Sequence, residues 1–133
     1  MIRDPNNPCL FCDIKKSGMS KENELAFASY DSYPVSKMHC LIIPKRHVRN
    51  YFDLTNNEII ACNELIKKIK TEVENKDTSV KGFNIGTNIG KISGQSILHC
   101  HIHLIPRREG DVANPQGGVR SVIPSKQHYK RKS

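Results

Sequence analysis

The sequence lacks several features that would place the protein outside the class of ordinary globular domains. No apolar run approaches the ~20 residues that a membrane helix needs. The first residues, 1–5, show no basic segment followed by an apolar stretch, so we expect no secretory signal. Internal repeats and low-complexity linkers are absent from the printed sequence. We therefore expect one compact unit with no membrane partner.

The cysteines argue against a disulfide framework, because there are five of them, an odd number. Cys9 and Cys12 form a C-x-x-C pair, whereas Cys40, Cys62 and Cys100 lie in apolar segments or in the histidine run. This pattern is typical of metal-binding and buried thiols in a reducing compartment, and it predicts a cytoplasmic protein. The isolated cysteines are most simply buried small hydrophobic residues.

The length and the net charge of the chain indicate its domain organisation and the kind of partner it attracts. Its 133 residues, 37% of them hydrophobic and 26% charged, predict a single domain over residues 1–133. The net charge of +8 attracts anions such as nucleotides and polyphosphates, and it attracts nucleic acid only non-specifically. Residues 107–133 are expected to be a loop-like, basic, solvated tail, in which Lys126, Lys130, Arg131 and Lys132 carry part of the net charge.

Hydrophobic patterning predicts strands separated by one long helix. Thr55 followed by Glu58 is a capping-box signature, and apolar residues then recur at steps of three and four to about Glu74. Because strands and helix do not alternate regularly, the pattern favours an α+β fold with an antiparallel sheet. The expected strands span residues 25–30, 39–43, 80–88 and 96–106.

The last of these strands contains half of the six histidines in the chain. Since side chains alternate along a strand, His99, His101 and His103 should share one face. The opposite face would then carry Leu98, Cys100, Ile102 and Leu104. Imidazole is a nucleophile, a proton donor and a metal ligand near neutral pH, so this spacing indicates chemistry. The alternative is a half-exposed strand that happens to carry histidines.

The motif Gly94-Gln95-Ser96-x-x-His99-x-His101-x-His103-x-x-Pro106 resembles the signature of the histidine-triad family of nucleotide hydrolases and transferases. Further motifs resemble its prokaryotic, zinc-containing, diadenosine tetraphosphate hydrolase-like branch: Cys9-x-x-Cys12, Tyr33-Pro34-Val35-Ser36-Lys37-x-His39, Ile43-Pro44-Lys45-Arg46-His47, Asn84-Ile85-Gly86-x-Asn88 and Gly117-Gly118-Val119-Arg120. The resemblance implies a five-stranded antiparallel sheet with one long helix and shorter helices. It also implies a homodimer, paired through the helix and an edge strand into a ten-stranded sheet.

The resemblance also implies catalytic roles. His101 would be the nucleophile that forms a covalent nucleotidyl intermediate, His103 would contact the phosphate and the leaving oxygen, and His39 would support the triad from the neighbouring strand. An alternative for His39 is a core histidine. Because family members that transfer the nucleotide to a sugar phosphate have glutamine at the third triad position, His103 favours a hydrolase.

Substrate-binding roles are implied for four further residues. Gln95 and Ser96 would donate hydrogen bonds to the phosphate, together with His103. Asp31 matches an acidic residue that holds ribose hydroxyls in relatives, and Asn88 matches a polar residue at the junction of phosphate and ribose. The alternatives are a surface turn for Asp31 and a loop-capping role for Asn88.

A structural zinc ion is the cofactor that the chain is expected to bind. Structural zinc takes four nitrogen or sulfur ligands in a tetrahedron, and a C-x-x-C pair with two distant histidines supplies that set. The resemblance implies that Cys9, Cys12, His47 and His99 are those ligands. The alternative is a pair of reduced cysteines without metal.

The leading interpretation is therefore a hydrolase that acts at the α-phosphorus of dinucleoside polyphosphates or nucleoside phosphoramidates and releases a nucleoside monophosphate. The alternatives are a nucleotidyltransferase and a nucleotide- or nucleic-acid-binding module with little turnover.

Overall fold

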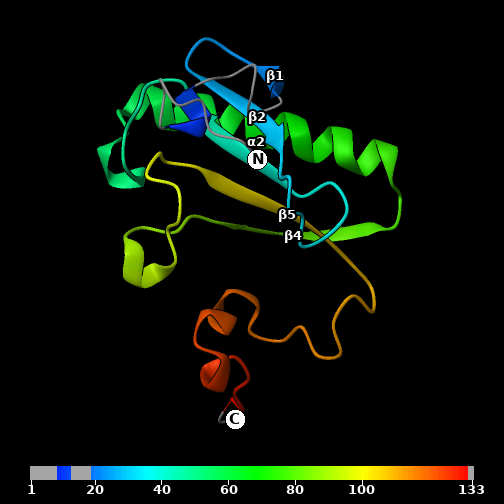
Figure 1. The fold of residues 1–133 in the computed structure, drawn as a ribbon. Helices are drawn as coiled ribbons and strands as arrows, with labels where there is room; N and C mark the ends of the chain where they lie inside the picture. The colour runs from blue at the N-terminus through cyan, green and yellow to red at the C-terminus, as the bar shows by residue number, and fades with distance from the viewer. Residues whose placement is uncertain (1–8, 13–18, 132–133) are drawn as a thin grey trace.

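The protein folds as one antiparallel sheet with a long helix against one face (Figure 1). The computed structural model describes residues 9–12 and 19–131. In this part of the chain the strand order is β1-β2-β3-β5-β4, with antiparallel pairing throughout. The strands are β1 (Met19–Glu22), β2 (Ala26–Tyr30), β3 (Cys40–Pro44), β4 (Val80–Gly86) and β5 (Ile102–Arg108). The predicted α+β fold, with a five-stranded antiparallel sheet and one long helix, is confirmed.

The helix α2 (Asn56–Lys76) packs on β2 and β3. Its buried face carries Ala61, Cys62, Leu65, Ile69 and Val73, which meet buried side chains of the central strands in one hydrophobic cluster. Burial of side chains of this size contributes about 1.5–3 kcal/mol each for the larger aliphatic residues. No helix in the described part of the chain is long and apolar enough to cross a membrane.

The opposite face of β2 and β3 is covered by the short 3-10 helix η1 (Leu10–Cys12). Leu10 and Phe11 are buried there against Phe27, Leu41 and Ile43. This packing places the cysteine pair next to His47 and His99, which lie in loops.

The histidine run forms less strand than predicted. Strand β5 begins at Ile102, and its pairing with β3 starts with Ile42 opposite Ile102. His99 and His101 therefore precede the strand, and Leu98 is exposed instead of lying on the buried face. Their rings are directed by individual hydrogen bonds, described below, and not by regular strand alternation.

The C-terminal segment is more ordered than a solvated tail. Arg107 and Arg108 are still part of β5, so the segment begins after them. It contains two 3-10 helices, η4 (Gly118–Val122) and η5 (Pro124–Lys126), and lies beyond the β4 edge in orange and red (Figure 1). As predicted, its basic residues Lys126, Lys130 and Arg131 are exposed. Lys132 lies outside the described residues.

The remaining connections are short. Two further 3-10 helices, η2 (Tyr51–Asp53) and η3 (Lys91–Ser93), lie in the loops before α2 and after β4.

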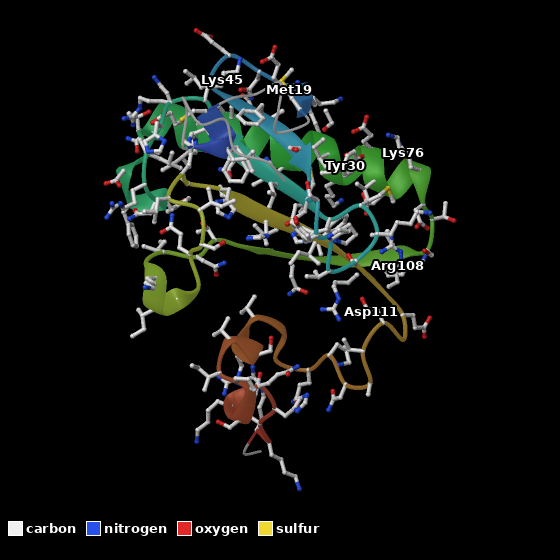
Figure 2. All side chains as sticks on the ribbon, in the orientation of Figure 1. Met19, Tyr30, Lys45, Lys76, Arg108 and Asp111 are labelled. Atoms are coloured by element: carbon white, nitrogen blue, oxygen red, sulfur yellow. The ribbon has the colours of Figure 1, made fainter. Side chains whose placement is uncertain are left out.

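At the end of β5, the Arg108 guanidinium donates to Asp77 Oδ2 (3.0 Å) and to the Lys37 carbonyl oxygen (3.0 Å). These two bonds join the end of α2 to the loop before β3. Figure 2 shows Arg108 at this end and Asp111 in the following turn.

One ion pair joins the start of α2 to the loop after β3. Thr55 and Glu58 form the predicted capping box. The buried Glu58 carboxylate also accepts from Arg46 Nε (3.1 Å) and Arg46 Nη2 (2.8 Å). The hydrogen bond from Arg46, more than any other contact, holds the pKa of Glu58 below its ordinary value.

Replacing Glu58 with Gln should lower the free energy of unfolding by about 1–2 kcal/mol at neutral pH, because charged hydrogen bonds to Arg46 are lost. A depressed folded-state pKa contributes stability above the unfolded pKa of about 4.3, and that contribution disappears as pH falls through the folded-state value. The difference from wild type, measured by urea unfolding, should therefore vanish in acid. The matched variant Glu74→Gln, on the exposed face of α2, should change stability by less than about 0.5 kcal/mol. Equal effects of the two variants would contradict this account.

Candidate active site and metal site

His101 is oriented by a carbonyl oxygen two residues before it. The ring is buried, and His101 Nδ1 lies 2.8 Å from the His99 carbonyl oxygen. Since a carbonyl can only accept, Nδ1 carries the hydrogen and Nε2 presents a bare lone pair. Burial lowers the pKa of His101, which favours the neutral ring. The Phe11 ring packs edge-on against His101 at a centroid distance of 5.1 Å.

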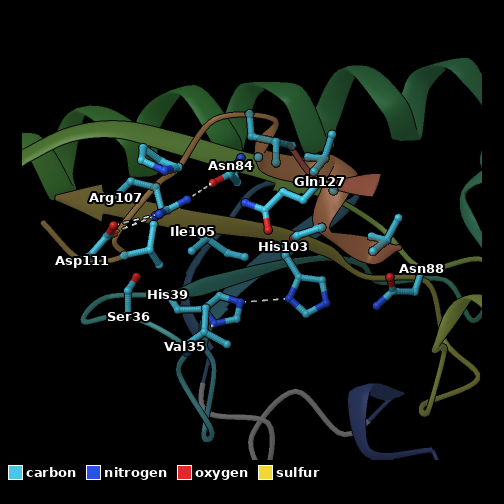
Figure 3. A pocket seen from close by; sticks show the side chains of 18 of the residues that line it. Val35, Ser36, His39, Asn84, Asn88, His103, Ile105, Arg107, Asp111 and Gln127 are labelled. Atoms are coloured by element: carbon cyan, nitrogen blue, oxygen red, sulfur yellow. Dashed lines mark hydrogen bonds and ion pairs between the residues drawn. The ribbon is translucent and has the colours of Figure 1, made fainter. Parts of the chain in front are cut away.

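His39 and His103 form a second directed pair. The Val35 backbone N–H donates to His39 Nδ1 (3.1 Å), so the hydrogen of neutral His39 is on Nε2. His39 Nε2–H then donates to His103 Nδ1 at 2.9 Å (Figure 3). His103 must therefore carry its own hydrogen on Nε2. Burial, reinforced by His101 and His39, lowers the pKa of His103 to about 4, so the ring is a neutral donor near pH 7.

His101 and His103 are thus neighbouring rings of opposite character. Their centroids lie 5.3 Å apart. One ring offers a bare Nε2, and the other offers an Nε2–H. This is the combination that attack on phosphorus needs, with a nucleophile beside a donor for the oxygens or the leaving atom.

The Asp31 carboxylate lies beside His39. Its Oδ2 is 3.6 Å from His39 Nε2, and its Oδ1 accepts from the Tyr33 backbone N–H (2.8 Å). The Asp31 carboxylate therefore bonds within the turn that follows β2, and it also lies close to His39. Its proposed contact with ribose hydroxyls stays a prediction.

The Gln95 side chain bonds to the backbone of its own chain. The amide is buried, and its Nε2 donates to the carbonyl oxygens of Arg49 (2.6 Å) and Ile97 (3.1 Å). Its Oε1 accepts from the Gly90 backbone N–H (3.0 Å). The side chain therefore holds the loop before His99, and its predicted phosphate contact stays a prediction. Ser96 next to it is exposed, and its phosphate contact stays a prediction.

The loop after β4 places two polar side chains, Thr87 and Asn88, near the histidines. Thr87 Oγ1 donates to the His101 carbonyl oxygen (2.7 Å), a contact that the sequence patterns did not reveal. The next polar side chain, Asn88, lines a cavity together with His103 and His39 (Figure 3). Its predicted place near the phosphate is compatible with this position and stays a prediction.

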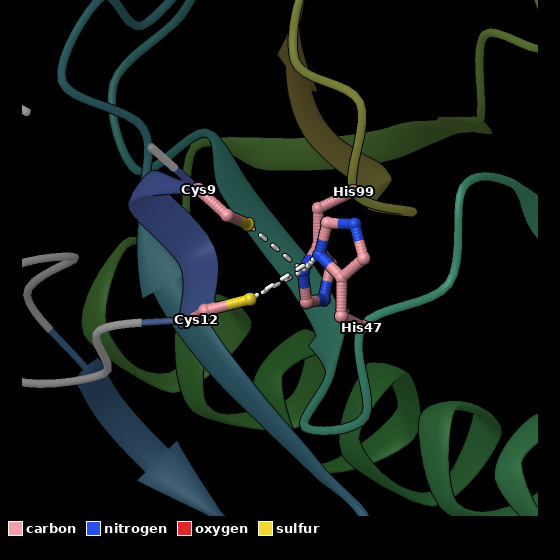
Figure 4. A group of neighbouring side chains, drawn as sticks. All are labelled: Cys9, Cys12, His47 and His99. Atoms are coloured by element: carbon pink, nitrogen blue, oxygen red, sulfur yellow. Dashed lines mark hydrogen bonds between the residues drawn. The ribbon is translucent and has the colours of Figure 1, made fainter. Parts of the chain in front are cut away.

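The four predicted metal ligands come together at one point (Figure 4). Their ligand atoms all lie within 4.8 Å of one another. His99 Nδ1 is 3.2 Å from Cys9 Sγ, 3.6 Å from Cys12 Sγ and 3.1 Å from His47 Nδ1. Bond lengths of about 2.3 Å for Zn–S and 2.0–2.1 Å for Zn–N place tetrahedral ligand atoms about 3.3–3.8 Å apart. The observed separations match that geometry within a few tenths of an ångström.

A carbonyl oxygen also directs His99. His99 Nε2–H donates to the Pro44 carbonyl oxygen at 2.8 Å, so the bare Nδ1 faces the two cysteines. Asp31, His39 and His103 form a second, three-residue cluster in the described residues, with their polar atoms also within 4.8 Å of one another. In that cluster His39 Nδ1 already accepts the Val35 backbone N–H, and His39 Nε2 is hydrogen-bonded to His103 Nδ1. We therefore interpret this cluster as a chain of hydrogen bonds and not as a metal site.

Comparison with known proteins agrees with this geometry. The HIT domain family model matches residues 15–110. The chain belongs to the HIT domain family. An adenosine 5'-monophosphoramidase of Schizosaccharomyces pombe is 32% identical over 103 residues, which are 74% of this chain and 74% of that protein. At the level of the family, this similarity supports a nucleotide hydrolase.

Two solved structures are similar in fold. A hypothetical histidine triad nucleotide-binding protein from Sulfolobus tokodaii superposes with a TM-score of 0.70 at 34% identity, covering 77% of this chain and 70% of that chain. A zinc-bound histidine triad family protein from Mycobacterium smegmatis superposes with a TM-score of 0.71 at 28% identity, covering 80% of this chain and 79% of that chain. The diadenosine tetraphosphate hydrolase-like branch, in contrast, has no support in these comparisons beyond the family itself.

If zinc occupies the Cys9, Cys12, His47 and His99 cluster, protein purified without added metal should contain about one zinc per chain by elemental analysis. Replacing His47 with Ala should lower both the zinc content and the melting temperature, the latter by about 5 °C, because the ion joins three distant segments. His128→Ala, which removes an exposed histidine outside the cluster, is the matched control and should change neither. Zinc-free protein that melts at the wild-type temperature would contradict a structural role.

Proposed function

We propose that this protein is a nucleotide hydrolase that cleaves at the α-phosphorus of nucleoside phosphoramidates or dinucleoside polyphosphates and releases a nucleoside monophosphate. The observation that carries the proposal is the pair of opposite ring tautomers, with a bare Nε2 on His101 and a hydrogen on Nε2 of His103. The named phosphoramidase relative supports it at the level of the family.

The reaction would proceed in two displacements. In the first, the His101 Nε2 lone pair attacks phosphorus, a P–N bond forms, and the bond to the leaving atom breaks with its electron pair. His103 Nε2–H hydrogen-bonds to the leaving atom, and a leaving amine also takes up one proton from solvent. In the second, water attacks phosphorus, the P–N bond to His101 breaks, and the protons of water pass to solvent. The product is a nucleoside monophosphate.

Other residues would position the reacting groups. The His99 carbonyl holds His101, Thr87 holds the His101 carbonyl, and His39 holds the hydrogen of His103 on Nε2. Asp31 would bind ribose hydroxyls, and Asn88 and Ser96 would contact the phosphate. Zinc, when bound by the four ligands, would join the N-terminal segment to the segment that carries His101, which is a structural contribution. The proposed location of the protein is the cytoplasm.

Replacing His101 with Ala should lower kcat by about 1,000-fold or more for adenosine 5'-phosphoramidate, because no group remains to form the covalent intermediate. AMP binding should stay measurable, since the phosphate and ribose contacts remain. His128→Ala serves as the control and should retain wild-type kcat. Product identification by chromatography checks that AMP is released. Near-normal turnover by the His101 variant would overturn the mechanism, and absence of AMP release by wild type would overturn the function.

We also propose that the protein acts as a homodimer through the β4 edge and α2. In the described part of the chain β4 is an edge strand, and an open edge normally pairs or is protected. On α2, Ile60 is 55% exposed, and Ile59 and Ile66 are only half-buried. An exposed apolar helix surface and an edge strand are both features that a second copy commonly covers.

Sedimentation at micromolar concentration should give twice the chain mass for wild type and the single chain mass for Ile60→Glu, because a charge would be buried in the interface. Ile92→Glu is the matched control: Ile92 is fully exposed and lies outside α2 and β4. It should remain dimeric. A wild-type monomer, or a dimer that tolerates Ile60→Glu, would exclude this interface.

A further inference from the structure

Met38 is the one non-glycine residue with a positive φ among residues 9–12 and 19–131. Its φ of 70° lies in the left-handed region, where the Cβ of an L-residue crowds a backbone carbonyl oxygen. Such a conformation persists only where the surrounding contacts require it, and it is concentrated at functional sites. Met38 directly precedes His39, whose Nε2–H donates to His103. The strained residue therefore lies one peptide away from the hydrogen-bonded histidines.

Met38 lies in a tight turn. The His39 backbone N–H donates to the Ser36 carbonyl oxygen (3.1 Å), which closes a β-turn with Met38 at its third position. A positive φ at that position is characteristic of a type II turn, in which glycine is the usual residue. The turn brings the chain back on itself, so that the Val35 N–H reaches His39 Nδ1 at 3.1 Å (Figure 3).

The turn is attached both to β5 and to the hydrophobic core. Ser36 Oγ donates to the Pro106 carbonyl oxygen (2.7 Å), and Arg108 Nη2 donates to the Lys37 carbonyl oxygen (3.0 Å). The Met38 side chain is partly buried and packs against the hydrophobic cluster between the sheet and α2. Because the polar contacts come from the two residues before Met38, its side chain is what ties the left-handed residue itself to the core.

The Val35 N–H sets the direction of the hydrogen bond between the histidines. His39 is buried, and burial lowers its pKa, so the ring is neutral and carries one hydrogen. With the Val35 N–H on Nδ1, that hydrogen is on Nε2 and is donated to His103 Nδ1. If His39 carried it on Nδ1 instead, the same bond could form only in reverse, from His103 Nδ1–H. His103 Nε2 would then have no hydrogen to donate.

The backbone N–H is a stronger determinant of this direction than the nearest carboxylate. Asp31 Oδ2 favours the same His39 tautomer, but it lies 3.6 Å from His39 Nε2, which is too far for a hydrogen bond. The donor on His103 therefore depends mainly on where the turn places the Val35 N–H.

We propose that Met38 is a positioning residue whose left-handed turn, held by its side chain, keeps the Val35 N–H on His39 Nδ1 and thereby keeps the hydrogen of His103 on Nε2. The inference rests on the proposed function, because it gives the origin of the donor that serves the leaving atom. Met38 acts through the backbone of the turn and through His39.

Three substitutions separate the backbone conformation of Met38 from its side chain. In Met38→Gly a positive φ has no steric cost, whereas Met38→Ala keeps that cost and loses the anchor. Met38→Leu keeps both at similar volume. Leu25→Ala is the matched control, because Leu25 is also partly buried against the same hydrophobic cluster but lies outside the turn. Thermal melting of each variant checks that it is folded.

Nitrogen-15 NMR of histidine-labelled protein near pH 7 reads the ring tautomers without any substrate. Wild type, Met38→Leu and Met38→Gly should carry the hydrogen on Nε2 in both His39 and His103. Met38→Ala should show a mixture of tautomers in both rings, because the turn no longer holds the Val35 N–H in place. Leu25→Ala should keep the wild-type tautomers, although its melting temperature falls.

Two substrates read the donor on His103. The amine of adenosine 5'-phosphoramidate needs a proton to leave, whereas the p-nitrophenyl ester of AMP releases a stable phenolate. Met38→Ala should lower kcat by about tenfold for the phosphoramidate and by less than about threefold for the ester, with KM nearly unchanged. Met38→Gly, Met38→Leu and Leu25→Ala should leave the ratio of the two kcat values close to that of wild type.

Wild-type tautomers in Met38→Ala, or a kcat ratio that Leu25→Ala changes equally, would overturn the positioning role. Greater impairment of Met38→Gly than of Met38→Ala would overturn the role of the left-handed conformation. If Met38→Ala is unfolded at the assay temperature, Met38→Gln, which keeps the side-chain length but weakens the apolar anchor, gives the same comparison. Failure of the proposed function is distinguishable, since wild type would then release AMP from neither substrate while the tautomers still report on Met38.

Discussion

Two backbone carbonyl oxygens determine what the central histidines can do. The Pro44 carbonyl accepts from His99 Nε2–H, and the His99 carbonyl accepts from His101 Nδ1–H. Because a carbonyl only accepts, the first bond leaves Nδ1 of His99 unprotonated toward the cysteines, and the second leaves Nε2 of His101 unprotonated. Two residues apart in sequence, the rings take opposite tautomers, which suit the proposed roles of His99 as a metal ligand and His101 as the nucleophile.

The surrounding fold keeps these carbonyls in place. Pro44 ends β3, which lies beside β5 in the centre of the sheet, and Thr87 at the end of β4 holds the His101 carbonyl. Phe11, buried under the sheet with η1, packs against both His99 and His101 at centroid distances of 5.9 and 5.1 Å. The proposed metal ligand His99 and the proposed nucleophile His101 therefore pack against the same ring, so displacement of the Cys9 and Cys12 segment should also displace His101.

Much of this arrangement could be predicted from the sequence, because strong local signals determine it. Thr55 and Glu58 mark the start of α2, and apolar runs mark β2 and β3. Strand β1 was missed, since Met-Ser-Lys-Glu has no apolar alternation and is held by pairing with β2. The start of β5 was placed too early because period-two spacing cannot show that His99 and His101 are directed by single hydrogen bonds. The contacts of the Gln95 side chain could not be predicted, because one of its three partners, Arg49, is distant in sequence. That residues 112–122 and Gln127 line a cavity together with β4 could not be foreseen, since no apolar periodicity links them to that strand.

Backbone carbonyl oxygens thus fix opposite tautomers on His99 and His101. Nitrogen-15 NMR of histidine-labelled protein near pH 7, with resonances assigned by single-site variants, reads these tautomers. We expect a protonated Nδ1 and an unprotonated Nε2 for His101, and a protonated Nε2 for His99. A His101 ring protonated on Nε2, or on both nitrogens, at that pH would contradict this assignment.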